Sequence, residues 1–78
     1  MAIMYEDIIN FIEKKSSFKH TGGKDLIFTL KKEPSLSLKE GALISIAAKK
    51  EFDLIEYDLK FKNETTYLYI HQIDDPDE

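Results

Sequence analysis

Apolar and polar residues alternate along residues 52–73, and this alternation predicts a β-hairpin. Two arms rich in β-branched and aromatic residues flank a polar break at Asn63 and Glu64, which is a typical hairpin signal. Asparagine tolerates the positive φ that a two-residue turn requires, so we expect these two residues to form the turn. The sheet of the protein is expected to grow from this hairpin.

A two-residue turn separates the hairpin side chains into two faces, because successive residues of a strand point to opposite sides. The predicted core face carries Ile55, Tyr57, Leu59, Phe61, Leu68 and Ile70. The predicted exposed face carries Glu56, Asp58, Lys60 and Lys62 together with Tyr67, Tyr69 and His71. A three-residue loop would instead turn Leu68 and Ile70 toward solvent and bury His71. We expect the two-residue register.

Residues 4–15 have the periodicity of an amphipathic helix. Its apolar residues fall within one arc of the helical wheel and are Met4, Tyr5, Ile8, Ile9, Phe11 and Ile12. Acidic residues in the first turn and lysines in the last turn suit the helix dipole. The apolar stripe is expected to pack on the sheet.

The next segments are predicted as strands. Phe18 is expected to anchor a connection to the core, and a short strand could run through Lys19 and His20. Residues 26–31 alternate in a strand pattern with both faces largely apolar, which favours cover on both sides or a closed barrel. Pro34 ends this strand.

Residues 38–50 fit two structures. The spacing from Ser37 to Glu40 matches a capping box, so a second helix could begin here. As a helix, however, the apolar residues would scatter around the whole wheel, and Gly41 would lie in its first turn. We therefore expect a strand over residues 42–47, followed by a polar turn over residues 49–51.

The fold class is thus α+β. We expect an N-terminal amphipathic helix packed on a small antiparallel sheet, or on a partly closed SH3-like barrel, of four to five strands. The alternative order is helix, strand, helix, hairpin. Residues 1–73 are expected to form one domain, with residues 74–78 as a mobile acidic tail.

Length and composition limit the possible functions. A chain of 78 residues has room for one core, which makes a deep catalytic pocket improbable and a binding surface easy to accommodate. No cysteine is present, so disulfides and thiolate metal sites are excluded. No basic leader or apolar run of spanning length occurs, so a cytoplasmic protein without membrane contact is expected.

Catalytic and metal-binding motifs are missing from the sequence. His20 and His71 are far apart and neither has a second ligand in a recognisable motif. The C-terminal acids lack the spacing of a calcium loop, and no serine lies in a nucleophile-elbow pattern. We expect a protein that is not an enzyme and uses neither a metal nor another cofactor.

Charge is divided unevenly along the chain. The net charge of −4 combines +6 over residues 14–50 with −7 over residues 51–78. Every cation is lysine, so the residue best suited to bidentate recognition of phosphate or guanine is missing. The asymmetry favours two binding faces or simply a folded surface that interleaves both signs.

The tyrosine-bearing face of the hairpin is the best candidate site. Tyrosines are favoured anchors at protein interfaces, where flanking charges form a rim. The candidate partner-binding residues are Tyr67, Tyr69, His71, Glu56, Asp58, Lys60 and Lys62. The alternative is structural: the tyrosines would pack under a helix or strand, and His71 would pair with Glu56 across the hairpin.

We therefore expect a small acidic protein-protein interaction module with a basic partner. In its narrowest form it would inhibit or regulate a nucleic-acid-handling protein by mimicking nucleic acid, as small acidic phage-encoded inhibitors do. A second possibility is a nucleic-acid-binding small barrel. Its phosphate contacts would be Lys14, Lys15, Lys19, Lys24, Lys31, Lys32, Lys49 and Lys50. A third is a structural subunit, such as a phage particle component, that oligomerises through sheet edges.

Overall fold

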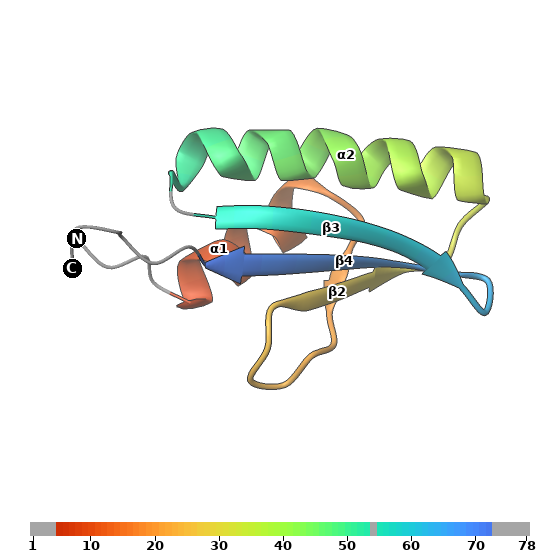
Figure 1. The fold of residues 1–78 in the computed structure, drawn as a ribbon, viewed down its shortest axis with the longest axis horizontal. Helices are drawn as coiled ribbons and strands as arrows, with labels where there is room; N and C mark the ends of the chain where they lie inside the picture. Colours follow the sequence, from red (N-terminus) through yellow and green to blue (C-terminus); the bar gives the residue numbers. More distant parts are fainter. Residues whose placement is uncertain (1–4, 54, 73–78) are drawn as a thin grey trace.

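The computed structural model describes residues 5–53 and 55–72 as two helices and a four-stranded sheet. The elements are α1 (Tyr5–Lys15), β1 (Lys19–His20), β2 (Ile27–Leu30), α2 (Pro34–Glu51), β3 (Ile55–Lys62) and β4 (Thr65–Gln72). The strand order is β1-β2-β4-β3, and each neighbouring pair is antiparallel. Figure 1 shows α2 running along β3, with α1 behind the strands. The described part of the chain is therefore an α+β fold with an open sheet.

The partly closed barrel is wrong. Closure would require β1 to pair with β3, but these strands are the two edges of the sheet, and β1 has only two residues. Strand β2 buries Phe28 on the helix side, whereas Ile27 and Thr29 on the other side stay partly exposed. Although both faces of β2 are largely apolar, only the face toward the helices is covered by other elements.

The expected strand over residues 42–47 is also wrong, because these residues lie inside α2. Pro34 occupies the first turn, where a missing N–H costs nothing. The backbone N–H groups of Leu36 and Ser37 donate to the carbonyl of Glu33 at 3.0 and 2.9 Å. The expected polar turn over residues 49–51 is the last turn of the same helix. The alternative order of helix, strand, helix and hairpin matches the described residues except that the two-residue strand β1 precedes β2.

Small and polar residues form most of the buried stripe of α2, so the stripe carries little hydrophobic signal. The residues buried against the rest of the protein are Ser37, Gly41, Ile44, Ser45 and Ala48. In contrast, Leu36, Leu43 and Ile46 are 57%, 60% and 50% exposed. A Cβ atom built on Gly41 would lie 2.6 Å from Cδ2 of Leu59 and 3.2 Å from Cζ of Phe18. The helix thus approaches the sheet closely where its side chains are smallest.

The core lies between the helices and one face of the sheet. Its fully buried large apolar side chains come from both halves of the chain and are Ile8, Ile12, Phe18, Phe28, Ile55 and Leu68. Phe18 anchors the segment between α1 and β1, as the sequence predicts. Helix α1 contributes Ile8 and Ile12 from its apolar stripe.

The predicted register of the hairpin is confirmed. Asn63 and Glu64 have φ angles of 52° and 58°, and Lys62 lies opposite Thr65. Leu68 and Ile70 are buried on the core face, which excludes the register with a three-residue loop. The expected helix residue Met4, the end of the predicted hairpin at Ile73 and the acidic tail of residues 74–78 lie outside the described residues.

Candidate functional site

The sheet face opposite the two helices carries the candidate site, and we call it the open face. The pairing of β1 with β2, β2 with β4 and β4 with β3 decides which side chains share it. Its exposed and partly exposed members are Lys19, Ile27, Thr29, Glu56, Asp58, Lys60, Lys62, Tyr67, Tyr69 and His71. All seven residues proposed from the sequence are therefore brought together on one surface, and three further residues join them.

Two stacked tyrosines form the centre of the open face. Tyr67 and Tyr69 are two residues apart on β4, an inner strand, so their rings project to the same side. The ring centroids are 6.2 Å apart with an interplanar angle of 27°. The ammonium group of Lys60 lies 5.8 Å from the centroid of Tyr69, within cation–π range. Both rings are partly exposed, so the pair presents an ordered aromatic surface.

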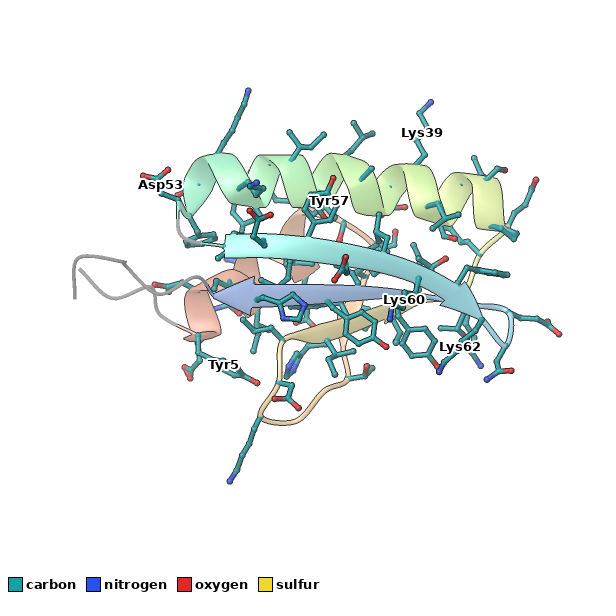
Figure 2. The ribbon with its side chains drawn as sticks, viewed as in Figure 1. Tyr5, Lys39, Asp53, Tyr57, Lys60 and Lys62 are labelled. Atoms are coloured by element: carbon teal, nitrogen blue, oxygen red, sulfur yellow. The ribbon has the colours of Figure 1, made fainter. Side chains whose placement is uncertain are left out.

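Charges are ordered along β3 beside the tyrosines. Glu56 and Asp58 occupy one end of the exposed row, and Lys60 and Lys62 occupy the other. Figure 2 shows Lys60 and Lys62 together near the hairpin turn. All four side chains are exposed, so solvent screens them and each contributes little to folding stability. The open face therefore has an acidic end and a basic end.

The acidic end has two nearby cationic or titratable groups. Nζ of Lys49 in α2 lies 3.4 Å from Oε2 of Glu56, and Nε2 of His71 lies 3.7 Å from Oδ2 of Asp58. The structural alternative has His71 paired with Glu56 across the hairpin, and the register does place these two residues opposite each other. The imidazole instead leans to the diagonal neighbour Asp58.

Sequence reasoning did not place Ile27 and Thr29 at the candidate site, and it named Lys19 only as a phosphate contact of the nucleic-acid-binding alternative. The register places Ile27 opposite Tyr69 and Thr29 opposite Tyr67, so β2 extends the aromatic surface. Beside Ile27 and Tyr69 lies a hollow of about 270 Å³. Its lining residues are Asp25, Leu26, Ile27, Tyr69, Ile70 and His71. The alternation of residues 26–30 predicts that Ile27 and Thr29 face away from the core. It does not predict that β2 pairs with β4, and this pairing is what brings them beside the tyrosines.

The open face combines aromatic rings with exposed charged side chains. Within residues 5–53 and 55–72, no three His, Cys, Asp or Glu side chains lie close enough together to hold a metal ion. Neither of the two described helices is long and apolar enough to cross a membrane. Aromatic rings, a hollow and ordered charges are features of a binding surface.

One carboxylate away from the open face has a perturbed pKa. The backbone N–H of Ser17 donates to Oε2 of Glu40 at 2.5 Å, and Lys32 lies 3.3 Å from Oε1. The Ser17 hydrogen bond, helped by Lys32, lowers the pKa of Glu40 below its ordinary value of 4.5. Through the hydrogen bond from Ser17, Glu40 connects α2 to the segment that follows α1. This contact stabilises the fold.

Comparisons with known proteins found no family model that matches the chain and no matching curated protein or solved structure.

Proposed function

We propose that the protein is a non-enzymatic interaction module that binds a protein partner through the open face. The observation that supports this proposal is the stacked pair Tyr67 and Tyr69 on an inner strand, surrounded by exposed charges. Interfaces commonly have tyrosines at a desolvated centre and polar groups at the rim. A tyrosine also loses little side-chain freedom on binding, because only two χ angles are fixed.

The order of charges on β3 defines the partner further. Basic groups of the partner would face Glu56 and Asp58, while acidic groups would face Lys60 and Lys62. The net charge of −4 favours a partner that is basic overall. In its narrowest form, the proposal is that the protein regulates or inhibits a basic protein that handles nucleic acids.

The proposal is tested by replacing both tyrosines. The full chain carrying Tyr67→Ala and Tyr69→Ala is compared with the unmodified protein in affinity purification from the native cell, followed by titration against the purified partner. Loss of two interface anchors is expected to weaken binding on the order of 30-fold or more. Thermal unfolding is expected to change little, because both rings are partly exposed.

A matched control removes two exposed apolar residues elsewhere. Leu36→Ala with Leu43→Ala changes the outer side of α2, where both side chains are more than half exposed. This variant is expected to keep the partner. Binding that survives the loss of both tyrosines, or that depends on the helix pair instead, would refute the proposal.

Single-stranded nucleic acid is a second candidate, favoured by the same stacked rings. Bases stack on aromatic side chains, and Lys19, Lys60 and Lys62 could contact phosphates on the same face. Two observations count against it: Glu56 and Asp58 share the face, and every cation of the chain is lysine. Retention on a single-stranded DNA column that weakens steeply with salt and is lost without the tyrosines would favour this candidate. Flow-through at low salt would eliminate it.

A further inference from the structure

Strand β3 lies at the edge of the sheet along its full eight residues. The N–H of Ile70 donates to the carbonyl of Leu26 at 2.9 Å, so the backbone groups of Ile70 point toward β2. Because backbone groups alternate along an antiparallel strand, those of Tyr69 point toward β3 and meet Asp58 there. The same alternation turns the backbone groups of the odd-numbered β3 residues outward. An edge of this kind is a template for another strand.

Three of the residues with outward backbone groups are Tyr57, Leu59 and Phe61. Their side chains lie on the helix side of the sheet, yet Tyr57 and Leu59 are only partly buried and Phe61 is 40% exposed. The edge therefore combines outward-pointing peptide groups with apolar side chains that are incompletely covered. A second strand paired with β3 would form hydrogen bonds with these peptide groups and cover these side chains.

The order of charged residues along β3 indicates that the second strand is β3 of another copy of the chain. When β3 pairs antiparallel with a copy of itself about Leu59, Glu56 lies opposite Lys62 of the second copy. Asp58 then lies opposite Lys60 of the second copy, so every facing pair has opposite signs. These pairs fall at non-hydrogen-bonded positions, where facing Cα atoms are about 4.5 Å apart and side chains are closest.

In registers shifted by one or two residues from Leu59, the facing side chains no longer all have opposite charges. Pairing about Asp58 or Lys60 brings two identical charges together at the two-fold axis. Pairing about Tyr57 sets Glu56 opposite Asp58, and pairing about Phe61 sets Lys60 opposite Lys62. Like charges directly opposite each other destabilise a strand pair. The sequence of β3 therefore favours one self-pairing register and disfavours the adjacent ones.

We propose that two copies of the chain associate through β3, with Leu59 of each copy at the two-fold axis, and form one continuous eight-stranded antiparallel sheet. The axis is perpendicular to the sheet, so the helices of both copies cover the same side. Tyr57 of one copy lies opposite Phe61 of the other, which buries the incompletely covered apolar edge. The two open faces join into one surface of twice the size.

Helix α2 is compatible with this arrangement. Lys49 reaches Glu56 on the open face, which identifies the flank of α2 that lies above the β3 edge. Ala42 lies seven residues before Lys49 and shares that flank. Because Gly41 is next to Leu59, the small side chain of Ala42 is level with the two-fold axis.

The proposal is tested by the mass of the full chain in sedimentation equilibrium across a concentration series. The unmodified protein is expected to reach twice the 9.1 kDa of one chain. Lys60→Glu with Lys62→Glu makes the edge wholly acidic, and Glu56→Lys with Asp58→Lys makes it wholly basic. Each variant alone is expected to have a dimer dissociation constant weakened roughly 100-fold or more, because all facing pairs become repulsive.

An equimolar mixture of the acidic-edge and basic-edge variants is expected to restore a dimer containing one copy of each. The matched control, Lys39→Glu with Lys50→Glu, changes the net charge equally but alters α2, where Lys39 points away from the sheet (Figure 2). This control is expected to dimerise as the unmodified chain does. Circular dichroism establishes that each variant is folded.

Amide exchange locates the interface independently of mass. The amides of Tyr57, Leu59 and Phe61 are expected to exchange slowly at concentrations that favour the dimer and quickly in the acidic-edge variant. An unmodified chain that stays monomeric near 1 mM would overturn the proposal. Equally decisive against it would be edge variants that dimerise normally, a mixture that stays monomeric, or a dimer in which these three amides remain unprotected.

Discussion

The hydroxyl oxygens of Ser37 in α2 and Thr66 in β4 lie 2.5 Å apart. Both side chains are completely buried, so their hydrogen bond connects the helix to the sheet where water has no access. Ser45, on the same buried stripe of α2, has a buried hydroxyl without a hydrogen-bond partner among the described residues. The two serines therefore have the same environment but opposite hydrogen-bonding states.

Replacing each serine with alanine is expected to change stability in opposite directions. Ser45→Ala removes a buried polar group without a partner and improves helix propensity, so it should raise the free energy of unfolding by about 0.5–1 kcal/mol. Ser37→Ala leaves the hydroxyl of Thr66 without this partner and should lower the free energy by about 1–2 kcal/mol. Urea unfolding measures both. Equal effects of the two substitutions would show that the Ser37 hydrogen bond contributes nothing.

Gly41 is expected to be required for the close approach of α2 to the sheet. Gly41→Ala gains about 1 kcal/mol of helix propensity, but its Cβ atom would overlap Leu59. Overpacking typically costs about 1–3 kcal/mol. The flexible end of Leu59 can shift, but the ring of the fully buried Phe18, 3.2 Å from the same Cβ atom, must also move, so a net loss of up to about 1 kcal/mol is expected. Repeating the substitution in a Leu59→Ala background removes the overlapping atoms. A double-mutant cycle should then give a coupling of at least about 1 kcal/mol, and additive effects would contradict the packing argument.

The hairpin turn contains a strained position that can be relieved. Glu64 has a φ of 58°, which disfavours a side chain, whereas Gly23 has a φ of 61° with open space around it. Glu64→Gly is expected to stabilise the protein by about 0.5–1 kcal/mol, and Gly23→Ala to destabilise it by a similar amount. Thermal unfolding of the two variants provides a matched comparison. Destabilisation by Glu64→Gly would show that flexibility of the unfolded chain outweighs the strain.

Glu40 is expected to make stability depend on pH. Because folding lowers the pKa of Glu40 below 4.5, its stabilisation is present above that pH and is lost as the pH falls through the lowered value. Glu40→Gln should lower the free energy of unfolding at pH 7 by about 0.5–1.5 kcal/mol. The difference from the unmodified protein should shrink at pH 3.

The control for Glu40 is a carboxylate in a more exposed ion pair. Glu56→Gln, which disrupts a contact with Lys49 on the surface, is expected to cost less than about 0.5 kcal/mol at pH 7. A Glu40→Gln effect that is the same at pH 7 and pH 3 would show that the carboxylate charge is unimportant.

The sequence by itself determined the hairpin and its two faces. The alternation of residues 55–62 and 65–72 and the turn at Asn63 and Glu64 are local, and a slip of one residue would expose Leu68 and Ile70. The same local pattern assigned all seven candidate residues to one side. Periodicity was sufficient because strand residues alternate strictly between a buried and a solvated face.

The tertiary structure decided the state of residues 34–51, the order of the strands and the full extent of the open face. Helix α2 packs through Ser37, Gly41 and Ser45, so its buried stripe carries no strong hydrophobic signal. The pairing of β2 with β4 brings Ile27 beside Tyr69 although they are far apart in sequence. Contacts of this kind depend on which surfaces fit together in three dimensions, and close approach at small residues leaves almost no trace in the hydrophobic pattern.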